Sequence, residues 1–434
     1  MGGKIMRKKS YIGGFFLIRT FLTKFLIFGL FFLCSVSFLI ADSGNYNRNY
    51  NIYIDELYIT GLSRTRLSTA ERPLRRFIGL PAREVDTNDV QAAILATGIL
   101  EPLTVEIDGG VLSVTVREKW TIFPIPVFMA GSDGMMGGLA FFDANAFGLN
   151  DNFFLAGMYH SDGWLASVGY IHASQRRRAP GWNAMAAFSR EERFDRNQRS
   201  EDLRRFELDS VSVNAGLNFP LPGNTNLFSF SPQFSFNEKM IRESIYTLNG
   251  PEEGLRLFGI GGELAARRSS WDGFFLSQET ASLRYSYRTT LDGFSYHSIR
   301  FRGTWERSLV PGFRMSIRTG LLYEPEAPVL FESSPAAAQV AILPRNFSAR
   351  NYAGLSMGLE KSLFQFPAGT LSLSAAYQLV YSQGSILSNS VDHGPAGMLT
   401  FYLNRLAIPA VGLGVAYNAR ENYFQGSLSL GMSF

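Results

Sequence analysis

One stretch spells a catalytic motif: Gly354-Leu355-Ser356-Met357-Gly358 matches the G-x-S-x-G pattern of a hydrolase nucleophile. That motif needs a sharp strand-to-helix turn that exposes the serine. Here the serine lies in an alternating segment that predicts an ordinary strand. The four histidines, at positions 160, 172, 297 and 393, show no metal-ligand spacing such as H-x-x-x-H. The sequence therefore predicts no enzyme, no metal site and no cofactor.

Charged side chains are a second source of chemistry. Six arginines fall on the polar faces of neighbouring predicted strands: Arg284, Arg288, Arg300, Arg302, Arg314 and Arg318. They predict a hydrated, charged wall with Glu306 and Glu324 as counter-ions, and an anion-selective pore is the alternative. The charged stretches 176–178 and 190–205 are interpreted as solvated loops.

The elements that would position these residues are strands, and the end of the chain carries the clearest one. Polar or small residues alternate there with large apolar ones, which are Phe424, Leu428, Leu430, Met432 and Phe434. Successive side chains of a strand point to opposite faces, so one face suits lipid and the other a wet lumen. An aromatic terminus after such a pattern resembles the terminal strand of bacterial outer-membrane barrels. The edge strand of a soluble sandwich is the alternative.

The beginning of the chain predicts export. Residues 1–24 carry six cations and no acid, and an apolar run follows up to Ala41. This pattern is typical of a cleaved signal peptide over residues 1–41, and an uncleaved anchor is the alternative. Cys34 is a weak lipoprotein candidate because hydrophobic residues follow it.

Removal of this leader changes the charge balance. The whole chain has a net charge of +4, and loss of six cations leaves −2. The basic composition is therefore no sign of nucleic-acid binding. The single cysteine leaves with the leader, which suits an oxidising compartment.

Residues 50–119 predict a small mixed domain in the order strand, helix, helix, strand, strand. The first helix is expected over 69–78, and the second begins at Asp86 or Thr87, either of which can cap it. Alternating residues on both sides of an Asp-Gly-Gly turn predict a hairpin over 103–116.

The same region resembles a known module. Residues 95–118, LATGILEPLTVEIDGGVLSVTVRE, are similar to the end of a POTRA domain, and Tyr58-Ile59-Thr60-Gly61 with Thr65 resembles its opening. The resemblance implies a periplasmic domain that binds unfolded outer-membrane proteins, in part by pairing a client strand with its sheet edge. An unrelated α/β domain is the alternative.

From Trp120 onward the sequence predicts strands alone. At about 20 residues per strand and connection, residues 120–434 hold about sixteen strands. An even number returns both ends of a barrel to the same side of a membrane. The expected strands are 121–131, 134–143, 152–160, 164–173, 182–190, 206–218, 227–237, 255–267, 276–288, 294–306, 313–324, 352–363, 370–382, 396–404, 408–418 and 423–434.

One POTRA domain followed by such a barrel resembles the BamA, TamA and Sam superfamily of outer-membrane assembly and secretion proteins, also called the bacterial surface antigen family. Residues 137–157 resemble its second and third strands, with Asn145-Ala146-Phe147-Gly148 at their turn. The expected fold class is mainly β: a transmembrane antiparallel barrel preceded by one small α/β domain.

In this superfamily a long outer loop folds into the lumen, and the arginine of its Arg-Gly-Phe tip meets acids on the following strands. The resemblance puts this loop at 325–350 and its tip at Arg345-Asn346-Phe347. Glu360 matches one acidic partner, whereas Ser382, in a segment ending at Gly384, replaces the other. In the implied lock the loop arginine keeps one of its two acidic partners. The sequence therefore does not decide whether the superfamily's translocase activity is retained.

The sequence predicts an outer-membrane barrel that helps to insert other barrel proteins through a weak seam between its first and last strands. Pro124 and Pro126 lie in the first strand, and neither has an N–H for the ladder. The expected partners are unfolded outer-membrane clients and outer-membrane lipid, with accessory lipoproteins as further candidates and no nucleic acid. The alternatives are a polypeptide secretion pore of the two-partner type, and a passive porin or surface antigen that retains only the fold.

Overall fold

The computed structural model describes residues 52–434, apart from 132–133, 173–179, 200, 222–226, 248–253, 273–274, 345–346, 368, 385–388, 404–405 and 431–434. The predicted signal peptide, with Cys34, lies outside the described residues. No helix in the described part of the chain is long and apolar enough to cross a membrane.

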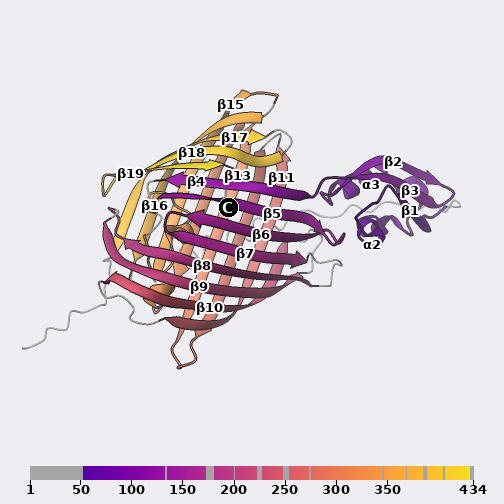
Figure 1. Cartoon of the computed structure of the whole chain (residues 1–434). Coiled ribbons are helices and arrows are strands. Elements are labelled where there is room, and N and C mark those ends of the chain that lie inside the picture. Colours follow the sequence, from indigo (N-terminus) through magenta and orange to yellow (C-terminus); the bar gives the residue numbers. More distant parts are fainter. Residues whose placement is uncertain are drawn as a thin grey trace, which may run out of the picture. The chain divides into compact units, whose positions relative to one another are not determined.

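The first part, which we call the α/β module (residues 52–119), has the predicted order of elements. These are β1 (Glu56–Thr60), α2 (Leu67–Glu71), α3 (Thr87–Leu95), β2 (Leu100–Asp108) and β3 (Val111–Glu118), with short 3-10 turns η1 (Arg75–Phe77) and η2 (Ala82–Glu84) between the helices. β1 pairs in parallel with β3, and β3 pairs antiparallel with β2 (Figure 1). Ile54, Leu74, Ile94 and Leu112 are buried in the core between sheet and helices.

The two helices of the module begin and end for different reasons. The side chain of Asp86 caps α3 by accepting a hydrogen bond from Asn88 N, and Gly98 follows the helix with φ +74°. The first helix is shorter than the predicted 69–78. It ends before Pro73 and resumes only as the turn η1, because proline lacks the N–H that a continuing helix needs.

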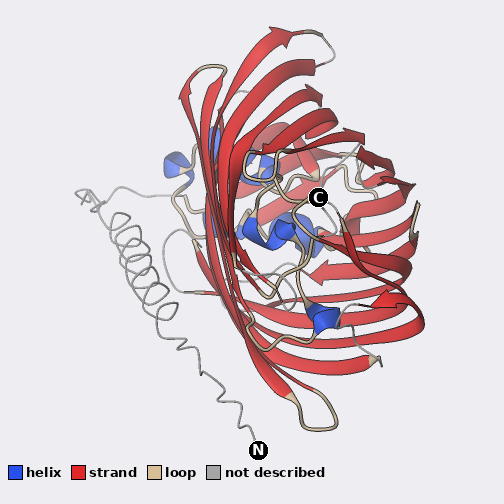
Figure 2. Ribbon diagram, turned by 90° about the vertical axis from the view of Figure 1, so that its left-hand side faces the viewer, coloured by secondary structure: helices blue, strands red, loops and turns tan. Residues whose placement is uncertain are grey.

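The second part is one antiparallel sheet of sixteen strands whose order closes on itself (Figures 1 and 2). The mainly β prediction is confirmed. The strands are β4 (Ile122–Gly131), β5 (Gly134–Ala146), β6 (Asp151–His160), β7 (Gly163–His172), β8 (Gly181–Arg196), β9 (Asp202–Pro220), β10 (Phe228–Thr247), β11 (Leu255–Asp272), β12 (Phe275–Thr289), β13 (Ser295–Val310), β14 (Phe313–Tyr323), β15 (Asn351–Gln365), β16 (Gly369–Gln383), β17 (Ser390–Leu403), β18 (Leu406–Asn418) and β19 (Tyr423–Leu430).

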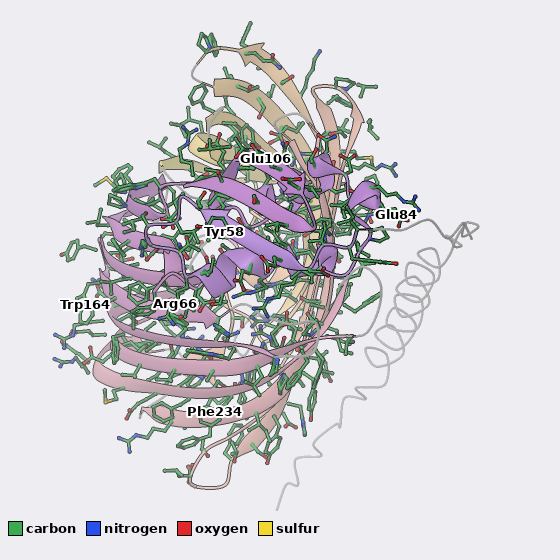
Figure 3. The ribbon with its side chains drawn as sticks, turned by 90° about the vertical axis from the view of Figure 1, so that its right-hand side faces the viewer. Tyr58, Arg66, Glu84, Glu106, Trp164 and Phe234 are labelled. Carbon is green, nitrogen blue, oxygen red and sulfur yellow. The ribbon has the colours of Figure 1, made fainter. Side chains whose placement is uncertain are left out.

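Side chains alternate between the two faces of this wall. On β10 the rings of Phe228, Phe230 and Phe234 are exposed, whereas Ser231 between them is buried. Figure 3 shows Phe234, and Trp164 of β7, at the outside of the wall. The apolar outer face and polar inner face follow from the period of two in the sequence.

Several strands are longer than the sequence indicated. β8, β9 and β10 have 16, 19 and 20 residues, while crossing a bilayer takes about 9–11. The predictions ended these strands where charged residues interrupt the apolar pattern. Hairpin pairing continues through those residues, because ladder hydrogen bonds do not depend on an oily face.

The connections between strands alternate between two ends of the barrel, because neighbouring strands are antiparallel. We call the end with the β5–β6 turn (147–150) the proximal end. The end with the β8–β9 turn (197–201) is the distal end. The long segment 324–350, between β14 and β15, leaves the wall at the distal end.

The β5–β6 turn binds the α/β module. Arg66 N donates to Gly148 O at 3.0 Å, and Asn145 Nδ2 donates to Thr65 Oγ1 at 2.9 Å. Gly148 has φ +73°, and a Cβ there would lie 2.3 Å from Arg64 O. Only glycine fits this close approach, which gives the Asn-Ala-Phe-Gly turn a structural role.

Glu118, the last residue of β3, holds the same loop from the module side. Its carboxylate accepts hydrogen bonds from the backbone N–H groups of Ser63 (3.1 Å), Arg64 (3.0 Å) and Thr65 (2.6 Å), and from the Ser63 hydroxyl (2.8 Å). Burial by itself raises the pKa of Glu118, but these bonds to the charged form lower it to about 2.

We predict that Glu118→Gln destabilises the α/β module by about 1–3 kcal/mol at pH 7. The pKa of Glu118 is lowered on folding, so its contribution is complete above the unfolded value near 4.5 and is lost as the pH falls toward 2. The urea midpoint of the module, followed by hydrogen exchange of its peptides in the full chain, should differ between variant and wild type at pH 7, and the difference should shrink below pH 4.5 and vanish only as the pH approaches 2. Glu101→Gln, which removes an exposed pair with Arg117, is the control. A difference that is constant with pH would contradict the assignment.

Candidate functional site: the seam and the lumen loop

The seam between the last and first strands has the fewest residue pairs of the barrel's ladders within the described residues. In the described residues β19 pairs with β4 through four residue pairs, Ser427–Leu430 with Phe128–Gly131. The neighbouring ladders β18–β19 and β4–β5 have eight and ten pairs.

The residues predicted for the seam occupy both strands. Pro124 and Pro126 lie in the part of β4 that precedes its pairing with β19, and both pair with β5 on the other side. On β19, Phe424 is exposed and Leu428 is partly buried. Leu430 is in the ladder, whereas Met432 and Phe434 lie outside the described residues.

The segment 324–350, which we call the lumen loop, lies inside the ring (Figure 2), because it contacts strands far apart around it. Leu330 O accepts a hydrogen bond from Lys239 Nζ of β10 at 2.7 Å. Leu343 O accepts one from Gln425 Nε2 of β19 at 3.1 Å. Six strands separate β10 from β19 by the shorter way around the ring.

A buried ionic cluster anchors the lumen loop to β8 and β9. Arg204 Nε lies 2.7 Å from Asp195 Oδ2, and Arg204 Nη2 lies 3.3 Å from Glu332 Oε2 of the loop. Ser348 Oγ donates to Asp195 Oδ1 at 3.1 Å, and Arg350 Nε lies 3.3 Å from Glu332 Oε1. Arg193 Nε also lies 2.8 Å from Asp195 Oδ1, so three cations meet two buried anions in this cluster.

The sequence analysis missed this cluster. The interpretation of 190–205 as a solvated loop is wrong for Asp195 and Arg204, each only 2% exposed. The lumen loop covers both residues. The order of residue types along β8 and β9 gives no information about a distant segment that packs over them. A signal was nevertheless present, since Arg204, Phe206 and Leu208 alternate on the inner face, and the latter two pack against Leu330.

On the opposite wall two glycines let the lumen loop approach the strands. A Cβ at Gly320 of β14 would lie 2.5 Å from Ala337 O, and one at Gly354 of β15 would lie 2.2 Å from Ala338 O. Gly354 is also part of the hydrolase-like pattern, and in the structure it allows the loop backbone to pack closely against β15. Ser356 lies within β15, where its Oγ accepts a hydrogen bond from a glutamine, and no strand-to-helix turn exposes it.

Glu360 and Ser382, which the resemblance placed at the two partner positions of the loop arginine, lie far apart in the structure. Ser382 pairs with Tyr352 in the β15–β16 ladder, so Glu360 lies eight residues farther along β15. At about 3.3 Å per residue this separation is roughly 26 Å. A single guanidinium cannot bind both side chains.

Both side chains have other partners. Glu360 accepts hydrogen bonds from Ser372 Oγ (2.6 Å) and Tyr402 Oη (2.9 Å), and it forms an ion pair with Arg314. Ser382 Oγ lies 2.9 Å from Ser390 Oγ. Glu360 is therefore satisfied by the barrel wall.

The predicted tip of the lumen loop is partly described. Arg345 and Asn346 lie outside the described residues. Phe347 is 1% exposed and packs edge-on against Tyr352, with ring centroids 6.2 Å apart. Gly384 follows β16 at the distal end. The aromatic residue of the tip is thus a core contact of the loop.

The predicted counter-ions of the arginine wall are confirmed. Arg318 Nη2 lies 2.6 Å from Glu306, and Arg314 Nη1 lies 3.2 Å from the same carboxylate. Arg288 Nη1 lies 3.7 Å from Glu324. These pairs cross-brace strands β12 to β14 on the inner face.

The histidines are dispersed in the fold as in the sequence. His172 contacts Asp151, while His297 and His393 each contact a tyrosine on a paired strand. Within the described ranges no group of three or more histidine, cysteine or acidic side chains could hold a metal ion.

No protein-family model and no curated protein matches the chain. Solved structures do match it. A BamA from Haemophilus ducreyi lacking POTRA domains 1–3 aligns with 13% identity and a TM-score of 0.59, covering 89% of this chain and 86% of that one. CdiB from Acinetobacter baumannii also has 13% identity and a TM-score of 0.59, covering 88% and 74%. CdiB from Escherichia coli aligns equally well, covering 87% and 77%.

These likenesses define the class of protein by its fold. The chain has the barrel architecture shared by BamA and CdiB, and the resemblance to the BamA and TamA superfamily is confirmed at the level of fold. A sixteen-strand ring with an occupied lumen is the arrangement in which any function must operate.

We predict that Arg204→Ala destabilises the barrel by about 1–3 kcal/mol, because it removes the most buried cation of the cluster and leaves Asp195 with Arg193 and Glu332 with Arg350 as their remaining cations. The temperature at which the folded band converts to the unfolded band in gel electrophoresis should fall, and the lumen loop should become sensitive to protease. Arg256→Ala is a matched control, since Arg256 is an exposed cation paired with Glu238 on a neighbouring strand. Equal effects of the two substitutions would refute the anchoring role.

We predict that Ser382→Asp lowers barrel stability and does not tighten the lumen loop. Ser382 contacts Ser390, which donates to the buried carboxylate of Asp392 at 2.8 Å. A second carboxylate beside this group adds like charge in a dry site. Thermal unfolding of Ser382→Asp and of the neutral control Ser382→Asn checks this. Greater stability of the aspartate variant would restore the original lock hypothesis.

Proposed function

We propose that this chain is a non-enzymatic outer-membrane barrel that assists insertion and assembly of other outer-membrane proteins through its β4–β19 seam. Residues 1–41 are its signal peptide, and residues 50–119 are a POTRA domain in the periplasm. The proximal end faces the periplasm and the distal end faces the outside. The apolar outer wall contacts lipid.

The observation that carries this proposal is the seam itself. It is the one ladder of the described ring that joins strands far apart in the sequence, with four described residue pairs, and Pro124 and Pro126 of β4 each lack a ladder donor. If β19 leaves β4, the freed edge would have unpaired backbone groups in lipid, which is costly, so that edge would attract a further strand. The terminal strand of an unfolded barrel protein is a strand of the required chemistry.

The α/β module supports the same proposal. Its three-stranded sheet has β2 at one edge, where Leu103 is exposed, and a client strand can add to such an edge. The clamp formed by Glu118, the loop 63–65 and the β5–β6 turn holds this sheet at the proximal end of the barrel. A client bound there would be delivered near β4, the strand that follows the module in the chain.

The second candidate is a polypeptide secretion pore of the two-partner type, favoured by the likeness to CdiB at the same TM-score. In that function the lumen loop would have to leave the lumen to admit a client, whereas seam insertion leaves the loop in place. The third candidate, a passive porin or surface antigen, would conduct ions without changing the outer-membrane proteome. Accessory lipoproteins are further proposed partners, and no cofactor, metal or nucleic acid takes part.

We predict that a disulfide across the seam blocks client assembly. Met129→Cys with Ser429→Cys joins two residues that are ladder partners in β4 and β19. Gly426→Cys with Val415→Cys joins partners in the β18–β19 hairpin and is the matched control. The measurement is the outer-membrane proteome of cells that depend on each oxidised variant.

The proposal expects loss of barrel proteins with the seam crosslink alone, reversed by a reductant. Normal assembly of other barrel proteins while the seam is crosslinked would contradict the proposal that the seam is a gate. In that case, loss of one exported polypeptide when the lumen loop is tethered would indicate the secretion pore. An unchanged proteome and exportome in both cases would indicate the passive barrel.

A further inference from the structure

The β8–β9 turn reaches the far side of the barrel. Gln198 Nε2 donates to Ser390 Oγ of β17 at 2.9 Å, and Arg199 Nε lies 2.7 Å from Glu421 Oε2 in the β18–β19 turn. In the ring of sixteen strands, seven strands separate β9 from β17 in either direction. A turn that starts on β8 and β9 and touches β17 therefore spans the distal mouth.

The length of the hairpin makes this span possible. β8 and β9 have 16 and 19 residues, which exceeds the membrane requirement of about 9–11. A surplus of roughly six residues at about 3.3 Å each extends the hairpin by about 20 Å. The hairpin also rests on the lumen loop, since Arg196 forms a β-bridge with Phe347 and Asp195 accepts from Ser348.

On β17 the turn meets a network of buried polar side chains joined by hydrogen bonds. Ser390 Oγ donates to Asp392 Oδ2 at 2.8 Å, and Asn418 Nδ2 donates to Asp392 Oδ1 at 3.0 Å. Asp392 and Asn418 are both 0% exposed. The Asn418 Oδ1 in turn accepts from the backbone N–H groups of Arg420 (3.1 Å) and Glu421 (3.3 Å). This hydrogen-bond network thus runs from β17 into the turn of the terminal hairpin β18–β19.

We propose that the β8–β9 turn is a latch that closes the distal mouth and holds the β18–β19 turn against β17. An exposed ion pair such as Arg199 with Glu421 contributes little by itself. Here it acts together with the hydrogen bond from Gln198 to Ser390, which connects the turn to the buried hydrogen-bond network. Release of the turn therefore opens the mouth and loosens the terminal hairpin in one event. This coupling concerns the barrel itself and does not depend on the identity of a client.

The test uses the purified full chain with the double substitution Gln198→Ala, Arg199→Ala. In planar lipid bilayers the variant should conduct ions more often and at higher conductance than wild type. In hydrogen exchange, peptides covering 418–424 should exchange about threefold to tenfold faster, the effect of losing about one or two polar contacts. Arg256→Ala, an equally exposed arginine whose partner lies on the adjacent strand, should change neither quantity, and heat modifiability verifies that each barrel is folded.

A double-mutant cycle of Arg199→Ala with Glu421→Gln provides a second measurement. The latch predicts that the combined effect on exchange in 418–424 is smaller than the sum of the single effects. Unchanged conductance together with unchanged exchange in 418–424 would overturn the proposal. Faster exchange confined to 197–201 would also overturn it, because the turn would then be a local contact without coupling to the terminal hairpin.

Discussion

The structure depends on one constraint: each strand of a wall with an apolar outer face must find backbone partners on both sides. Fifteen of the sixteen ladders meet this constraint between strands that are consecutive in sequence, and only β19 with β4 joins the two ends of the sheet. In the described residues that ladder has four residue pairs. The ring can therefore open at this ladder without separating strands that are consecutive in the sequence.

A ring of sixteen strands encloses a space that its own side chains do not fill. The lumen loop occupies this space, and its two sides are held by different physics. Toward β8 and β9 the contact is ionic, centred on Arg204 between Asp195 and Glu332. Toward β14 and β15 it is close apolar packing over Gly320 and Gly354. The loop is therefore a brace across the barrel.

The anchor of the lumen loop differs from the one that the superfamily resemblance implied. That resemblance placed an arginine on the loop and acids on the following strands. The described cluster has the acid Glu332 on the loop and Arg204 on β9, nearly across the ring. Charge complementarity can thus hold a loop in a lumen with the acid on the loop and the arginine on the wall.

The sequence by itself determined what depends on neighbours along the chain. The period of two defined the strands and their oily face, the Asp86 cap defined α3, and the Asp-Gly-Gly turn defined the hairpin of β2 and β3. Only the tertiary structure decided which residues meet: Arg204 with Glu332, Gln198 with Ser390, and Glu360 with Arg314. The physical reason is that alternation states which face a side chain occupies, whereas ring closure and the path of the lumen loop decide its height and its partner.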